Sequence, residues 1–170
     1  IDAHIAPEMQ KTMKAVAEAG GDMTKVNGDS IFPVLNMLNA KYFIMPLQGG
    51  QTVPVQNPYA YGNAWFVDEV KYVNNANEEI EGVGKVNLRH VAVADAKFKE
   101  QLNQSVKQDD TSVVKMTAYK PNNLTYEVKS SKGGVIVFSE IYYPGWTATV
   151  DGEPVELGRV DYILRALNVK

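Results

Sequence analysis

The chain has 170 residues, a formal net charge of −3 and no cysteine. This length suits one domain with a small appendage, and a chain of this size buries enough surface to fold without disulfides. The lack of cysteine excludes disulfide bonds, thiolate catalysis and cysteine-ligated zinc, and the scattered lysines and arginines form no basic stripe for nucleic acid. The longest apolar runs, such as residues 135–138, are far shorter than the ~20 residues of a membrane-spanning helix.

Helices are predicted near the N-terminus, with strands after them. A first helix covers residues 7–19, because Pro7 suits the first helical position and the two glycines that follow favour its end. A second, shorter helix covers residues 29–38, and a strand follows at 41–45. Residues 48–63 are rich in Gly, Gln, Pro, Asn and Tyr and are expected to form a long loop.

Strands dominate the rest of the pattern. Residues 64–73 and 90–94 are predicted strands, and a short helix capped by Asn77 lies between them around residues 78–83. From Thr111 onward, turn residues recur at regular spacing between apolar runs, which predicts a meander of about six short strands. Short antiparallel strands at this spacing are typical of a β-sandwich or a jelly roll.

Two turns shape the meander. Pro144-Gly145 predicts a bend, because proline presets φ for the first turn position and glycine accepts the positive φ that follows. Asp151-Gly152 predicts a tight hairpin, because a type I′ turn needs positive φ at both central residues. The residues expected on the inward face between these turns are Trp146, Ala148 and Val150.

The sequence therefore predicts an α+β, mainly β fold: an antiparallel β-sandwich or jelly-roll-like domain with a short N-terminal helical segment. We expect residues 1–47 to form that helical segment and the first strand, and residues 48–170 to form the β-sandwich domain, either separate from residues 1–47 or continuous with them. The chain opens at Ile1 without an initiator methionine and stops at Lys170 inside a strand-like run. We therefore expect it to be a piece of a longer protein.

A search for catalytic motifs finds no nucleophile elbow, phosphate-binding loop, dinucleotide-binding glycines or zinc-protease motif. No cofactor is therefore expected. His4 and His90 have no second histidine or cysteine at ligand spacing, so surface or packing roles are favoured over metal binding. Asp109-Asp110 is interpreted as part of a solvated loop rather than a calcium site.

Glu140 is the best candidate for a general acid. It lies in an apolar strand close to Tyr143 and Trp146, and burial would raise its pKa. Glycoside hydrolysis would need a second carboxyl group ~5 to 9.5 Å away. The favoured alternative is that Glu140 forms a structural ion pair with Arg159 or Arg165 on a neighbouring strand, because a buried carboxylate needs a partner.

Aromatic residues gather near the predicted loops and strand ends, and such rings can stack on sugars. Trp65 and Trp146 lie in predicted strands, so a place in the core is the competing interpretation for both. Tyr59 and Tyr61 lie in the long loop and are less easily assigned to a core. We expect any glycan contact to involve Tyr59 or Tyr61, with Trp65 at the exit of the loop, and Tyr143 and Trp146 as further candidates.

Several segments, in this order and spacing, carry a resemblance to a known family: residues 34–44, 62–67, 119–126, 138–152 and 159–166. With these segments the chain resembles the YfhO-like bacterial integral membrane proteins over about residues 30–170. The first 30 residues match less well.

The resemblance implies a parent protein with many transmembrane helices, similar to glycosyltransferases of the GT-C class that use lipid-linked sugars. In Gram-positive relatives the family is linked to glycosylation of envelope polymers such as lipoteichoic acid. The present chain would be the soluble part near the C-terminus, on the extracytoplasmic face of the bacterial cytoplasmic membrane. Its partners would be the transmembrane region of its own full-length chain and an envelope glycan or lipid-linked sugar.

Three functions stay open at this point. The leading one is a non-catalytic accessory domain that holds an acceptor or glycan, or that packs on the membrane part. The second is an independent carbohydrate-binding module. The third is a glycosidase-like enzyme that uses Glu140.

Overall fold

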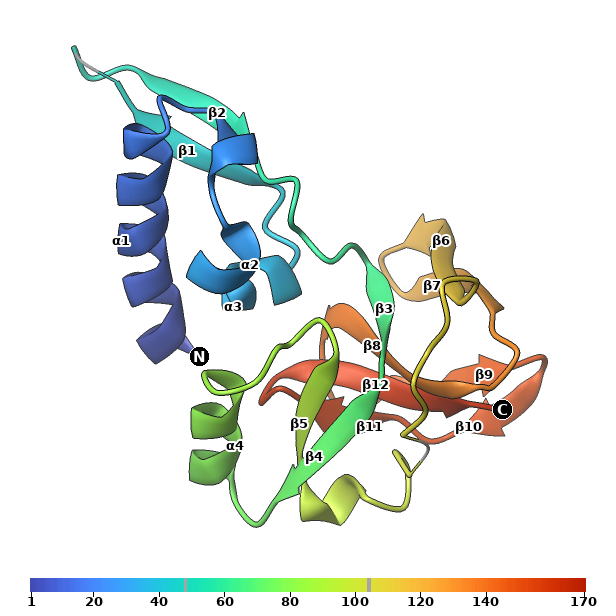
Figure 1. Cartoon of the computed structure of the whole chain (residues 1–170). Helices are drawn as coiled ribbons and strands as arrows, with labels where there is room; N and C mark the ends of the chain where they lie inside the picture. Colours follow the sequence, from blue (N-terminus) through green and yellow to red (C-terminus); the bar gives the residue numbers. More distant parts are fainter. Residues whose placement is uncertain (48, 104) are drawn as a thin grey trace. The chain divides into compact units, whose positions relative to one another are not determined.

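The computed structural model describes residues 1–47, 49–103 and 105–170 (Figure 1). These residues form two units, 1–61 and 62–170. A mainly β chain with antiparallel sheets and a short N-terminal helix is confirmed. The expected division between residues 47 and 48 falls within a hairpin of the first unit, and Gln48, where the long loop was expected to begin, lies outside the described residues.

The first unit combines short helices with a β-hairpin. Its elements are α1 (Asp2–Glu18), η1 (Met23–Lys25), α2 (Gly28–Ile31), α3 (Pro33–Met37), β1 (Tyr42–Pro46) and β2 (Thr52–Gln56). Two sequence predictions are wrong here. Pro7 lies inside α1 rather than at its first position, and residues 52–56 pair with β1 as a strand instead of forming a loop.

The helix predicted at residues 29–38 is split into α2 and α3. The break is at Phe32, whose φ of −139° and ψ of 53° lie outside the helical region and which precedes Pro33, the first residue of α3. A residue before proline is pushed out of the helical region by the proline ring, so one helix cannot run through this position.

A buried carboxylate joins α1 to α3. Glu8 accepts hydrogen bonds from the backbone N–H groups of Val34 (3.1 Å) and Leu35 (3.0 Å). These groups lie in the first turn of α3 and have no partner within the helix. Burial raises the pKa of Glu8. Glu8 therefore acts as the cap of α3. On the same helix as Glu8, the side chains of Met9 and Met13 are exposed.

The second unit is built on a four-stranded antiparallel sheet. Its strand order is β11-β12-β8-β3. The bounds are β3 (Ala64–Val67), β8 (Gly134–Ile141), β11 (Gly158–Val160) and β12 (Leu164–Val169). Strand β8 is central, and its first half, residues 135–138, is apolar on both faces, as its sequence predicts.

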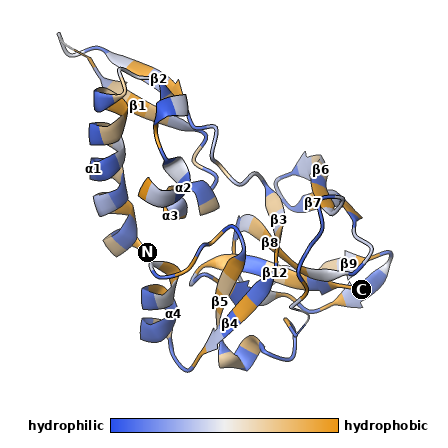
Figure 2. Cartoon of the chain, viewed as in Figure 1, coloured by the Kyte–Doolittle hydropathy of each residue, from blue (hydrophilic) through white to orange (hydrophobic). Residues whose placement is uncertain are grey.

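A parallel pair of strands lies beside this sheet and was not expected from the sequence. The run at residues 64–73 is divided at Asp68, so that β4 (Glu69–Val73) pairs in parallel with β5 (Val91–Asp95). The helix α4 (Ala76–Val83) connects them, and Asn75 rather than Asn77 caps it. The largely hydrophobic colour of β5 in Figure 2 agrees with its burial.

Two hairpins complete the second unit. They are formed by β6 (Val113–Lys120) with β7 (Asn123–Lys129), and by β9 (Ala148–Val150) with β10 (Glu153–Val155). Apolar side chains of both hairpins pack on a cluster formed by Ile136, Leu167 and Val169 in the sheet. The hairpins therefore cover one face of the four-stranded sheet.

The predicted turn at Asp151-Gly152 is confirmed. The two residues have φ of 52° and 89° and connect β9 to β10, with Val150 opposite Glu153.

Among the described residues, no helix combines the length and apolar character needed to cross a membrane.

Candidate functional site: an aromatic loop between two hollows

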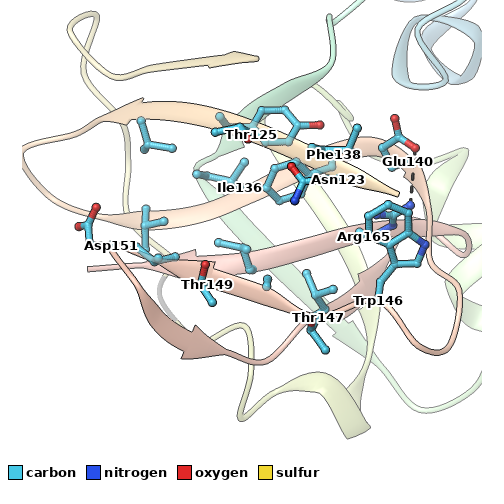
Figure 3. A pocket seen from close by; sticks show the side chains of 18 of the residues that line it. Asn123, Thr125, Ile136, Phe138, Glu140, Trp146, Thr147, Thr149, Asp151 and Arg165 are labelled. Atoms are coloured by element: carbon cyan, nitrogen blue, oxygen red, sulfur yellow. Dashed lines mark ion pairs between the residues drawn. The ribbon is translucent and has the colours of Figure 1, made fainter. Parts of the chain in front are cut away.

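A cleft of about 940 Å³ opens in the second unit beside β7, β8 and β9 (Figure 3). Its apolar side is formed by residues of the four-stranded sheet, among them Ile136, Phe138 and Leu167. Its polar side includes Thr125, Thr147 and Thr149. The volume of this cleft lies within the range of ligand sites.

The loop from β8 to β9 borders this cleft at one end. Pro144, Gly145 and Trp146 line the cleft, and they also line a second hollow of about 440 Å³ together with Phe98 and Tyr143. Gly145 has a φ of 96°, which the expected bend requires. We call residues 142–147 the aromatic loop. It presents aromatic side chains to both hollows.

A β-bulge directs charged side chains toward the aromatic loop. The pairing of β12 with β8 shifts from Leu164 opposite Ile141 to Arg165 opposite Phe138, which leaves Glu140 within the bulge. Arg165 donates from Nε to the backbone oxygen of Ile141 (2.9 Å). Bulges commonly redirect side chains next to functional sites.

At the end of the cleft beside this bulge, Arg165 contacts both Trp146 and Glu140. Its guanidinium lies 4.0 Å from the centroid of the Trp146 ring and its Nη2 lies 3.6 Å from the Glu140 carboxylate, as Figure 3 shows. The arginine is almost fully buried, whereas Glu140 is partly exposed. The stacked guanidinium covers one face of the indole, so Trp146 and Arg165 together form a wall of the site.

Arg159, the other partner considered for Glu140, belongs to a different cluster. Its Nη2 lies 2.6 Å from the carboxylate of Glu79 in α4, which is fully buried. Glu79 also accepts from the backbone N–H of Tyr162 (3.0 Å). Burial raises the pKa of Glu79. This cluster therefore ties α4 to β11 and the turn after it, and it does not line either hollow.

Three of the sequence-selected aromatic residues are engaged inside the protein. The hydroxyl of Tyr59 donates to the backbone oxygen of Val26 (2.6 Å). Tyr61 is 7% exposed and Trp65 is 4% exposed, and the Trp65 indole nitrogen donates to Leu88 (3.3 Å). Little ring surface is left at Tyr61 and Trp65 for stacking on a sugar, and Tyr59 is half-buried with its hydroxyl bonded inside the protein.

Tyr143 and Trp146 are placed differently. Tyr143 is 69% exposed, and Trp146 is half-buried between the two hollows. They are the aromatic residues suggested by the sequence that the structure brings together at hollows.

The structure shows no sign of a metal site in the part of the chain that it describes. Among the described residues there is no cluster of three potential metal ligands. The ring of His90 contacts the Asp68 carboxylate at 2.9 Å.

Sequence reasoning missed Tyr126. It packs edge to face on Phe138, and its hydroxyl is buried without a hydrogen-bond partner among the described residues. Burial and the Glu140 carboxylate raise the pKa of the Tyr126 phenol to about 12. The alternation of apolar and polar residues at 124–129 is consistent with an inward tyrosine, but nothing in the sequence shows that its hydroxyl is left unpaired beside a cleft.

The model of a family described as bacterial membrane protein YfhO matches residues 75–170, which include α4, both hairpins, the cleft and the aromatic loop. No curated protein and no solved structure matches the chain.

Proposed function

The chain belongs to the YfhO family of bacterial membrane proteins, and from this premise we propose that it is a non-catalytic accessory domain in the glycosylation of cell-envelope polymers. It lies on the extracytoplasmic face of the membrane, beside the transmembrane part of its own full-length chain. There it contacts an acceptor or glycan through the aromatic loop, with Tyr143 and Trp146 as the stacking side chains.

The aromatic loop is the observation that carries this proposal. An exposed tyrosine and a tryptophan fixed by Arg165 lie at adjoining hollows. Aromatic faces with few polar neighbours suit the apolar faces of sugar rings, and a ring fixed before binding loses little conformational entropy on binding. The geometry therefore favours recognition of a glycan.

The arrangement of carboxylates favours binding over hydrolysis. Glu140 is paired with Arg165, and Asp151, which lines the same cleft, lies at its opposite end in Figure 3. Hydrolysis of a glycoside needs two carboxyl groups on either side of one bond. Glu140 is therefore assigned a structural role.

The proposal is tested in cells that carry the full-length protein. Tyr143→Ala and Trp146→Ala are compared with Tyr119→Ala, which removes a tyrosine that is 68% exposed on β6 and lines neither hollow. The measurements are the sugar content of the envelope polymers and the amount of the protein in the membrane. We expect the first two variants to lower the sugar content by roughly fivefold, the equivalent of about 1 kcal/mol of stacking, at an unchanged protein level. Unchanged glycosylation in both variants would overturn the proposal.

A further inference from the structure

We propose that Arg165 and Glu140 form a polar subsite in the cleft. There a hydroxyl group of a neutral sugar accepts a hydrogen bond from the guanidinium and donates one to the carboxylate. This subsite rests on the proposed glycan contact at the aromatic loop. It adds the chemical group that is recognised, and it selects a sugar over an anionic part of an envelope polymer.

Arg165 has hydrogen-bond donors that the described chain does not use. The residue is 8% exposed and lines the cleft. Its Nε donates to the backbone oxygen of Ile141, whereas its two Nη groups donate to no atom among the described residues. A guanidinium carries five N–H donors, so most of them lack a protein acceptor. Because unmade hydrogen bonds are costly for a largely buried group, a polar ligand that supplies acceptors is favoured here.

The Glu140 carboxylate beside Arg165 has unused acceptors. Its Oε2 lies 3.6 Å from Nη2 of Arg165, which is an electrostatic contact but too long for a hydrogen bond. No described residue donates a hydrogen bond to this carboxylate, and its side chain is 30% exposed where it lines the cleft. Figure 3 shows both charged side chains at one end of the cleft, next to Trp146. The structural role of Glu140 as the partner of Arg165 therefore leaves its oxygens open to a ligand.

The separation of this donor and this acceptor suits a bridging hydroxyl group. An oxygen atom can lie about 2.8 Å from both Nη2 and Oε2, accepting from the first and donating to the second. Polar contacts longer than a hydrogen bond are often bridged by water, and a sugar hydroxyl offers the same combination of lone pairs and a proton. An ionised carboxylate or phosphodiester cannot donate, and an ammonium group cannot accept. Neither kind of ion would therefore bridge the pair.

The surroundings of the pair fit a sugar ring. Tyr126 lines the same cleft, and its hydroxyl is buried without a partner among the described residues. Burial and the Glu140 carboxylate raise the pKa of this phenol to about 12, against the opposing effect of Arg165, so it remains a neutral polar group at physiological pH. Phe138 adds apolar surface for the C–H groups of a ring. Trp146 lines both hollows, so a single glycan can reach the subsite and the aromatic loop.

The experiment uses the whole chain and methyl glucoside, a neutral sugar in which each hydroxyl group can be replaced by fluorine. Fluorine preserves the ring but cannot donate a hydrogen bond. The Nε–H signal of Arg165 and the indole N–H signal of Trp146 are followed by NMR during the titration. We expect both signals to shift at millimolar sugar, and at least one replacement to weaken binding by about fivefold or more. Dimethyl phosphate, an anion without a hydroxyl group, should leave the Arg165 signal in place.

A variant of Glu140 identifies the acceptor. Glu140→Ala removes the carboxylate, and the fold should tolerate this because the ion pair is partly exposed. The hydroxyl group whose replacement weakens binding to the native protein should then matter by less than about twofold. Glu127→Ala is the matched control, because Glu127 is exposed on β7 and lines neither hollow. It should keep the full dependence on that hydroxyl group.

The outcomes separate this subsite from the proposed function. Equal affinity of all the fluorinated sugars, an equal shift of the Arg165 signal by dimethyl phosphate, or an unchanged hydroxyl dependence in Glu140→Ala would each overturn the subsite. A shift of the Trp146 signal alone would overturn the subsite and leave glycan contact at the aromatic loop in place. No shift of either signal at millimolar sugar would overturn both.

Discussion

Asp161 is a fully buried carboxylic acid in the turn between β11 and β12. One oxygen accepts from the backbone N–H of Val93 (2.8 Å), and the other has no hydrogen-bond partner among the described residues. Burial, opposed by the Val93 hydrogen bond and reinforced by Glu79, raises the pKa of Asp161 to about 8. The folded protein therefore holds a proton here that the unfolded chain, with an ordinary pKa near 3.8, releases at neutral pH.

We predict that Asp161→Asn stabilises the protein at neutral pH. The folded state of the native protein binds the extra proton between the two pKa values, so stability falls as pH rises from about 4 to 8. The amide is neutral throughout, keeps the acceptor for Val93, and tolerates the φ of 50° at this position. The free energy of unfolding should rise by about 2 kcal/mol at pH 7. Chemical denaturation at pH 4 and at pH 7 measures it, and an equal effect at both pH values would contradict the assigned cause.

Gly152 gives a second prediction. Its φ is 89°, and a Cβ added there would meet no atom within 4 Å, so a substitution acts through the backbone and not through a clash. Gly152→Val should lower the free energy of unfolding by about 1 kcal/mol or more, because a β-branched residue resists positive φ. Gly152→Asn is the matched control and should cost less. An unchanged melting temperature in the valine variant would contradict the turn geometry.

The bulge between β8 and β12 depends on one arginine. Arg165 donates to the backbone oxygen of Ile141 beside the bulge, and its guanidinium stacks on the Trp146 ring. We predict that Arg165→Lys lowers the free energy of unfolding by about 2 kcal/mol, because lysine cannot form this bond and the stack together. Glu140→Gln should lower it by less than about 1 kcal/mol, since the ion pair is partly exposed. Equal losses in thermal unfolding would show that the ion pair, rather than the bulge, is what Arg165 stabilises.

Elements whose signals are local could be predicted from the sequence. The turn at Asp151-Gly152 and the alternating strand β7 follow from turn chemistry and from a period of two, and both lie where they were expected. The break before Pro33 also has a local cause, because the proline ring disfavours helical backbone at the residue that precedes it. The parallel pairing of β4 with β5 is decided by contacts far apart in the sequence, and no local pattern distinguishes it from antiparallel pairing.

The candidate site could be predicted only in part for the same reason. Tyr143 and Trp146 share a loop, so their proximity is visible in the sequence. The contact of Arg165 with Trp146, the role of Glu8 as a helix cap and the engagement of Tyr59 by Val26 join residues about 20 or more positions apart. These contacts depend on the register of the strands and on tertiary packing, which override local propensity.

The features that indicate a function lie in the second unit of the chain, residues 62–170. The family match covers only residues of the second unit, and so do the cleft and the aromatic loop. The two aromatic residues of the first unit that the sequence suggested for glycan contact, Tyr59 and Tyr61, have their side chains engaged or buried. Glycan contact is therefore expected in residues 62–170, and signals from residues 1–61 serve as an internal reference for any binding experiment.

Contact of the aromatic loop with glycan can be tested directly through the two tryptophans of the chain. The indole N–H signals of Trp146 and Trp65 are followed by NMR while envelope glycan fragments are added to millimolar concentration, which suits a site with one or two stacking rings. We predict that the Trp146 signal shifts with saturation, while the signal of Trp65, buried and bonded to Leu88, stays in place. A Trp146 signal that does not move at millimolar glycan, or that moves equally in the Tyr143→Ala variant, would contradict the claim.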